Sequence, residues 1–234
     1  MAADPIATVS ELCSFPGRLA GTDAERRAAG AIAGELRSEG WRVDVEPTYV
    51  QPQWALVHLL HCAIAAIGSM IAAIEPAISF AIVLFAATSA YLDLTGRAYL
   101  LRRLLFRRAS QNVRARAPGS PEESPRVVLC ANLDAPRTGA AYGPLAQRLQ
   151  AWAARAFPVA SSPTRIWFWS IALLLPPLGA RMAGIDASWL AVAQLPQTLI
   201  LIVACFLLGE IALSGASPGA NLNASGVAAA LTAA

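Results

Sequence analysis

The sequence predicts an α/β protein in which a partial mixed sheet with flanking helices is interrupted by two transmembrane helical hairpins. Two observations lead to this class. First, 56% of the 234 residues are hydrophobic and only 14% are charged, whereas soluble domains are about 45–50% apolar and about 25% charged. Second, the remaining polar segments alternate between helical and strand patterns. The expected order is a helix–strand part (1–50), a first transmembrane hairpin (54–94), a middle part with strands and an amphipathic helix (97–164), a second hairpin (165–213) and a closing loop with the start of a helix (214–234).

The opening part predicts two helices and a strand. Residues 5–15 suit a short helix, and apolar residues four apart predict a second helix over residues 24–38. Asp23 is expected to cap the start of this helix and Gly40 to end it. Residues 41–50 alternate between apolar and polar side chains, as a half-buried strand does.

Four apolar blocks predict the membrane helices. They cover residues 54–74, 76–92, 166–180 and 187–209, and a helix needs about 20 apolar residues to cross a bilayer. The third block is the shortest and contains two consecutive prolines. Short connections join the blocks in two pairs, so each pair predicts a hairpin that crosses the membrane and returns. The alternative, buried helices of a soluble core, is disfavoured because the polar segments are too few to surround four such helices.

Basic residues predict the orientation of the hairpins. The chain has no lysine, and five arginines follow the second block: Arg97, Arg102, Arg103, Arg107 and Arg108. Basic residues close to a membrane helix favour the cytoplasmic side. We therefore expect a multi-pass protein of the cell membrane with its polar part in the cytoplasm, where these arginines contact anionic lipid headgroups. A nucleic-acid partner is not expected, since the cluster directly adjoins a membrane helix.

The middle part predicts two further strands and an amphipathic helix. Residues 111–117 are expected to form a strand, residues 118–125 a polar turn, and residues 126–131 a continuous apolar strand in the buried interior of the sheet. Residues 144–157 predict a helix with Trp152 and two leucines on one face. This helix is expected to lie either on the membrane surface or against the soluble domain.

Two polar motifs indicate that the polar part of the chain resembles a known protein family. One reads N-L-D at residues 132–134, and the other reads G-A-N-L-N-A-S-G at residues 219–226. Together with G-R-L-A-G-T at residues 17–22, they resemble the co-catalytic di-zinc aminopeptidases of peptidase family M twenty-eight. That family carries H-x-D after a core strand and G-[AI]-[ND]-D-N-[AG]-S-G further along. The resemblance implies a zinc-exopeptidase-like fold and a metallopeptidase, a hydrolase that acts on peptides.

The motif positions differ from the family at the metal ligands. By the resemblance, Asn132 replaces the first zinc histidine and Leu222 replaces the bridging aspartate. Two zinc ions roughly 3.5–4 Å apart repel by about 20 kcal/mol at an effective dielectric of 20, and a leucine side chain cannot offset this. Asp134 would orient the missing histidine, while Asn221 and Asn223 are expected to shape and cap the final helix.

No metal ligand, cofactor-binding residue or confident catalytic residue is therefore expected in this chain. Bound zinc is expected only if the full-length protein is active. The family's remaining ligands would lie beyond Ala234, so the chain is expected to be either a fragment or a truncated relative.

Polar residues in the apolar blocks are a second set of candidates. His58 and His61 lie three apart on the first membrane helix, where they could form a metal pair or a proton relay. The alternative is that they lie at headgroup level, as is expected of Asp93 and Glu210. The four cysteines have no C-x-x-C spacing and predict no disulfide framework.

Three functions are compatible with these features. The first is a membrane-anchored pseudoenzyme related to the zinc aminopeptidases, acting as a scaffold or binding module for a peptide or protein partner. The second is an active membrane-bound zinc metallopeptidase whose remaining site lies beyond Ala234. The third is a transport-associated membrane protein.

Overall fold

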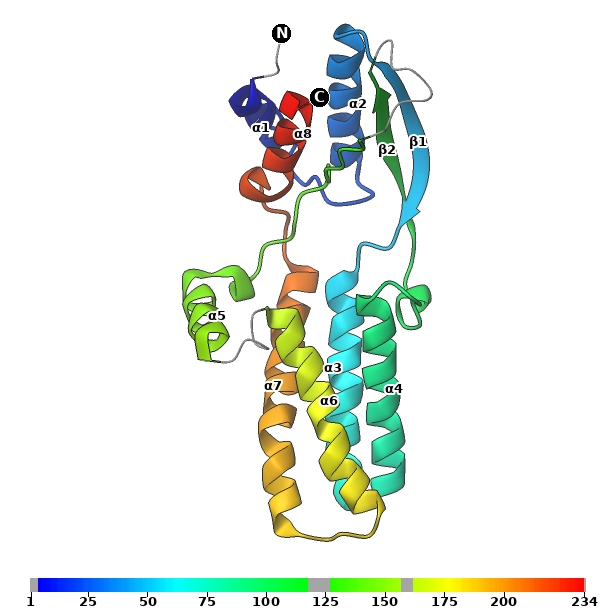
Figure 1. Ribbon diagram of the computed structural model, residues 1–234, viewed down its shortest axis with the longest axis vertical. Coiled ribbons are helices and arrows are strands. Elements are labelled where there is room, and N and C mark those ends of the chain that lie inside the picture. The colour runs from blue at the N-terminus through cyan, green and yellow to red at the C-terminus, as the bar shows by residue number, and fades with distance from the viewer. Residues whose placement is uncertain (1–3, 118–126, 157–161, 234) are drawn as a thin grey trace. The chain divides into compact units, whose positions relative to one another are not determined.

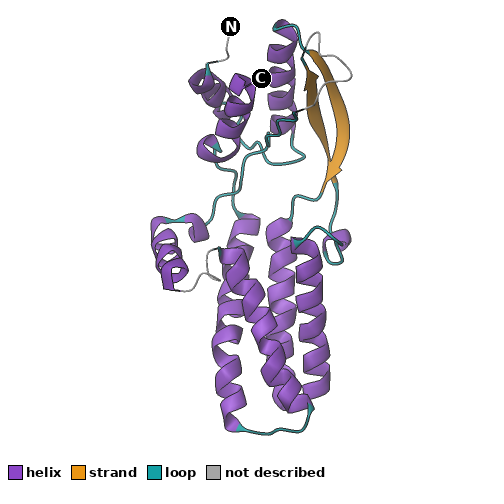
Figure 2. Cartoon of the chain, in the orientation of Figure 1, coloured by secondary structure: helices purple, strands orange, loops and turns teal. Residues whose placement is uncertain are grey.

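The computed structural model describes residues 4–117, 127–156 and 162–233, and most of them are helical (Figure 2). They divide into two compact units. Unit 1 comprises Met1–Pro52, Phe106–Thr138 and Ser214–Ala234, and unit 2 comprises Gln53–Leu105 and Gly139–Leu213.

Unit 1 begins with the two predicted helices, α1 (Pro5–Cys13) and α2 (Asp23–Ser38). The cap of α2 corrects the prediction, because Thr22 is the N-cap and its hydroxyl accepts from the backbone N–H of Glu25 at 3.3 Å. The Glu25 carboxylate in turn accepts from the backbone N–H of Gly21 at 2.7 Å. Asp23 is instead the first helical residue, where a negative charge favours the helix dipole.

The sheet of unit 1 is one antiparallel pair, β1 (Arg42–Val50) and β2 (Arg108–Arg116). Arg42 pairs with Arg116 at one end and Val50 with Arg108 at the other. Helix α2 packs on both strands (Figure 1). The core of unit 1 joins α1, α2 and the C-terminal segment, and Val43 and Val113 of the two strands pack against it. Its buried residues are Leu12, Ala28, Ile32, Leu36, Ala224 and Val227. The apolar face expected for α2 is thus buried as predicted.

The predicted interior strand over residues 126–131 is wrong for residues 127–131, which form no strand. Arg126 and the predicted turn over residues 118–125 lie outside the described residues. Val127 and Val128 are 86% and 78% exposed. An interior strand needs hydrogen-bonded neighbours on both sides, and the only strands among the described residues, β1 and β2, pair with each other. A mixed zinc-exopeptidase-like sheet is therefore not confirmed.

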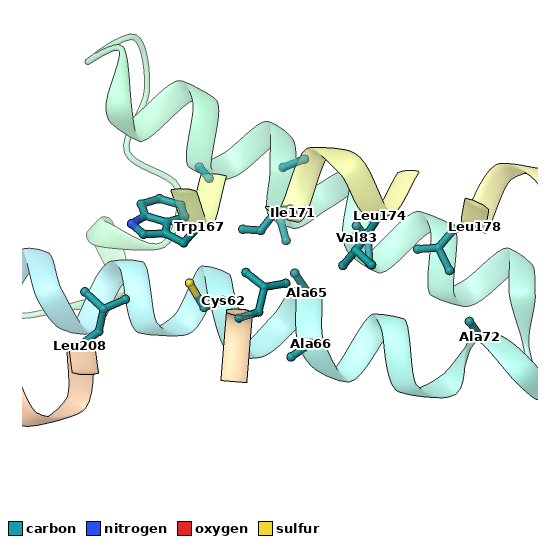
Figure 3. Close-up of a cluster of buried hydrophobic side chains, with 14 of the residues drawn as sticks. Cys62, Ala65, Ala66, Ala72, Val83, Trp167, Ile171, Leu174, Leu178 and Leu208 are labelled. Atoms are coloured by element: carbon teal, nitrogen blue, oxygen red, sulfur yellow. The ribbon is translucent and has the colours of Figure 1, made fainter. Parts of the chain in front are cut away.

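Unit 2 is built around four helices, each running beside its neighbours (Figure 1). They are α3 (Trp54–Met70), α4 (Pro76–Leu94), α6 (Pro163–Met182) and α7 (Ser188–Leu213). Helix α3 contacts α4 and α7, and α6 contacts α4 and α7. Side chains from all four form one buried apolar cluster; Trp167, Ile171, Leu174 and Leu178 supply the α6 part (Figure 3).

Small residues allow the first hairpin to pack closely. A Cβ on Gly68 of α3 would lie 2.8 Å from Val83 and 2.9 Å from Ile82 of α4. The hydroxyl of Ser79, which is fully buried, donates to the Gly68 carbonyl at 2.7 Å. Small residues and interhelical hydrogen bonds of this kind are the usual means by which membrane helices associate. Pro76 opens α4 at its first turn, where its missing N–H costs nothing.

Three helices among the described residues are long and apolar enough to cross a membrane: Trp54–Ala73, Pro76–Leu94 and Ser188–Leu213. The first includes the short helix η1 (Ile71–Ala73). Helix α6 is 20 residues long but carries an arginine near each end and two internal prolines. Large apolar side chains on the bundle helices point outward and are exposed, including Phe85, Leu199, Val203 and Phe206.

The amphipathic helix predicted over residues 144–157 is α5 (Pro144–Ala156), and Phe157 lies outside the described residues. Its apolar face is not buried, because Leu145, Leu149 and Trp152 are 71%, 58% and 68% exposed. Short helices precede it (η3, Ala140–Tyr142) and follow α4 (η2, Arg102–Leu104).

Candidate functional site

The structure brings the two motif segments side by side in unit 1. The segment after Asp134 runs antiparallel to the segment before Gly219, with an isolated bridge between Arg137 and Ala216. The backbone N–H of Ser217 donates to the Pro136 carbonyl at 2.8 Å. Residues about 80 positions apart in the sequence therefore lie side by side.

Gly219 sets the geometry of the second motif. Its φ of 72° lies in the left-handed region, which L-residues with a Cβ avoid. A Cβ there would also approach Ala135 and Pro136 to 3.3 and 3.2 Å. From Gly219 the chain enters a π-helical turn, η5 (Ala220–Ala224), and then α8 (Ser225–Ala233). Single π-turns are frequent at functional sites.

Asn223 makes side-chain hydrogen bonds that join the two motifs. Its amide Nδ2 donates to Oδ1 of Asp134 at 3.2 Å and to the Asp134 backbone carbonyl at 2.5 Å. The Asn223 side chain thus joins the entry to the final helix to the first motif, while capping by Asn221 and Asn223 stays a prediction. Burial raises the pKa of Asp134 above its ordinary value, while Arg18 and the Asn223 amide oppose that rise.

Arg18 completes this site and was not singled out from the sequence. Its side chain is 1% exposed, and it donates to the carbonyls of Leu12 and, at 3.4 Å, of Pro218. The Arg18 carbonyl accepts from the backbone N–H of Ala135. Burial lowers the pKa of Arg18, and Asp134 opposes that change. The available signal was an arginine inside the G-R-L-A-G-T motif, since a buried arginine is rare unless it is paired.

The other predicted motif residues are not part of this buried contact. Asn132 and Asn221 are exposed, and Leu222 is 68% exposed. Zinc is bound by thiolate, imidazole and carboxylate groups, and of the motif positions only Asp134 offers one. Because Asn223 already donates to that carboxylate, the residues present do not fit a di-zinc centre. Among residues 4–117, 127–156 and 162–233, no group of three or more His, Cys, Asp and Glu could hold a metal ion.

The two histidines of unit 2 lie inside the bundle. His58 is 6% exposed and His61 is fully buried. The His61 Nε2 lies 2.9 Å from the Ser89 hydroxyl of α4, and the His58 ring lies 4.9 Å from the Trp167 ring of α6, centroid to centroid. Both side chains are therefore enclosed by neighbouring helices, while their position at headgroup level stays a prediction.

Two acidic residues that were expected at the membrane interface have defined partners. Asp93 accepts from Arg102 at 2.6 and 3.1 Å, and its side chain is 1% exposed. Glu210 accepts from the backbone N–H of Ala140 at 2.9 Å. Arg102 therefore differs from the exposed Arg103 and Arg107, because its guanidinium belongs to a buried ion pair.

Comparisons with known proteins add no relative. No protein family, no curated protein and no solved structure matches this chain.

Proposed function

We propose that this chain is a multi-pass membrane protein related to the zinc aminopeptidases of family M twenty-eight, whose peptidase-like part is non-catalytic and serves as a scaffold or binding module. The observation that carries the proposal is the contact of Asn223 with Asp134. It supports a common origin, because both motifs lie at one place. It also supports loss of chemistry, since the one retained carboxylate is held by an amide.

The chemistry of the surrounding residues supports the same proposal. A co-catalytic zinc pair needs a negatively charged group between the ions, and the side chain at that position of the motif is Leu222. The positively charged Arg18 and the neutral Asn223 amide both favour the ionised form of the Asp134 carboxyl. Both favour a carboxylate that joins two loops over one that takes up a dication. The hydrogen bonds at this site thus hold the loop at residues 134–138 against the entry to α8.

The bundle supports anchorage by two hairpins that cross the membrane four times. Helix α6 spans about 30 Å at 1.5 Å per residue, which matches the hydrocarbon thickness. Arg165 and Arg181 lie near its two ends, where their long side chains can reach the headgroups. The arginines after α4 favour a cytoplasmic location for unit 1, and the exposed Arg103 and Arg107 would meet anionic lipid there.

The exposed face of α5 supports a position on the membrane surface. Leu149 and Trp152 face outward on a helix that also carries Arg148 and Arg155, the composition of a helix lying in the interface.

The proposal is tested by measuring hydrolysis of aminoacyl chromogenic substrates by the purified full-length protein, with and without added zinc. A known di-zinc aminopeptidase in the same detergent serves as the positive control. We expect no turnover above background under either condition. Zinc-dependent turnover that is lost when Asp134 is replaced by alanine would favour the active metallopeptidase instead.

A further inference from the structure

A small cavity lies in unit 2 at the end of the bundle where α3 and α6 finish and α7 begins. It has a volume of about 200 Å³, and its lining includes Arg181, Gln194, Ser69 and Thr198 among apolar residues. None of these residues belongs to the motifs of unit 1 or to the arginine cluster after α4.

The polar lining residues form one connected network across three helices. The Arg181 Nε donates to Oε1 of Gln194 at 2.9 Å, and the Gln194 Nε2 donates to the Ser69 hydroxyl at 3.5 Å. The Ser69 and Thr198 hydroxyls lie 2.7 Å apart. Gln194 and Ser69 are 6% and 8% exposed. The network therefore fixes the position of the Arg181 guanidinium at the edge of the cavity.

Arg181 brings a positive charge whose ion-pair partner among the described residues is a carboxylate in solvent. Its side chain is 13% exposed, and the nearest carboxylate, Asp186, lies at 3.8 Å with a side chain that is 99% exposed. The other acidic residue close to the end of these helices, Glu75, is exposed. A partly buried guanidinium is stabilised by an anion that can accept two hydrogen bonds, and a phosphate oxygen pair has that geometry.

We propose that this cavity binds a phosphate group, carried either by a phospholipid headgroup or by a soluble phosphate. Two features favour the lipid. Met70 and Leu195 supply an apolar wall beside the polar network, which suits the start of an acyl chain. The exposed Asp186 beside Arg181 would meet the amine of a zwitterionic headgroup such as phosphatidylethanolamine.

The position of the cavity agrees with a headgroup site. Helix α7 has 26 residues and spans about 39 Å, which exceeds a hydrocarbon core of about 30 Å. Ala191 lies one turn from the start of α7, so the mouth of the cavity falls near the boundary between headgroups and acyl chains. The inference rests on the membrane placement in the proposed function but not on the state of the zinc motifs.

The test is native mass spectrometry of the detergent-solubilised full-length protein titrated with phosphatidylethanolamine, with diacylglycerol and inorganic phosphate as separate arms. We expect one phosphatidylethanolamine per chain and no binding of diacylglycerol. Arg181→Gln should weaken binding about tenfold or more, the loss of one charge-assisted contact. Arg165→Gln, an exposed arginine of the same helix, should leave it unchanged.

A second variant separates loss of the site from loss of the fold. Ala191→Trp fills the cavity and leaves the polar network intact, so it should abolish binding while the protein keeps its melting temperature. Displacement of the lipid by millimolar inorganic phosphate would support the phosphate site and assign it to a soluble ligand. Equal lipid binding by the wild type, Arg181→Gln and Ala191→Trp would overturn the proposal. A protein that fails to co-float with vesicles would instead contradict the membrane placement itself.

Discussion

Gly219 provides a sharp test of the contact between the two motif segments. Replacing it with alanine puts a Cβ at a φ of 72° and at 3.2–3.3 Å from Pro136, Ala135 and Arg18. The left-handed conformation alone costs roughly 1–2 kcal/mol. Crowding against a proline ring and a backbone-attached methyl group, neither of which can rotate away, adds about 1–3 kcal/mol.

Two matched glycines separate these contributions. Gly17 has a φ of 74° and no atom within 4 Å of its would-be Cβ, so Gly17→Ala should show the conformational cost alone. Gly34, inside α2, is also open, and Gly34→Ala should stabilise unit 1 by about 0.5–1 kcal/mol. From most to least stable, the expected order is Gly34→Ala, wild type, Gly17→Ala and Gly219→Ala.

Hydrogen exchange of the full-length protein measures this order, because the exchange rate of α2 and β1 amides reports the opening free energy of unit 1. The difference between Gly219→Ala and Gly17→Ala should accelerate exchange by about five- to 100-fold, at tenfold per 1.4 kcal/mol. Equal acceleration in the two variants would refute the packing of Gly219 between the motif segments.

Three other predictions follow from the ion pair, the buried carboxylate and the proposed orientation. Arg102→Gln leaves the buried Asp93 without this ion pair and should destabilise unit 2 by about 3–5 kcal/mol. The control Arg97→Gln should destabilise it by less than ~1 kcal/mol. Equal melting temperatures of the two variants in detergent would contradict this prediction. The pKa of Asp134 is raised in the folded state, so the folded protein holds this proton more tightly than the unfolded chain does. The wild type should therefore lose stability relative to Asp134→Asn as the pH rises from about 4 toward 7. Chemical denaturation across this range checks the sign, and a gain with rising pH would refute it. In a variant that keeps only Cys130, which is exposed, an impermeant maleimide should label inverted vesicles and spare intact cells; the reverse pattern would contradict a cytoplasmic unit 1.

Local patterns predicted the helices well because each pattern reflects one element's own environment. The four-residue spacing on α2 and the apolar runs of α3, α4 and α7 required no knowledge of partners. The strand over residues 126–131 failed for the converse reason, since an apolar run becomes a strand only where another strand pairs with it. Val127 and Val128 have no such neighbour among the described residues.

The candidate site was predictable in part. The motifs put Asp134 and Asn223 among the candidate residues, and the structure shows a hydrogen bond between them; their role in a site stays a prediction. Arg18 and the pairing of Asp93 with Arg102 could not be found by periodicity, because each depends on where the chain folds back. Thr22 was missed as the helix cap because Asp23 beside it is an equally good capping residue type.

Zinc occupancy beside Asp134 decides whether the peptidase-like part has lost its metal site. An anomalous difference map at the zinc edge, from crystals of the full-length protein grown with excess zinc, would show any ion bound near Asn132 and Leu222. We expect no peak there and an Asp134 carboxylate still in contact with Asn223. Two peaks about 3.5–4 Å apart would contradict it.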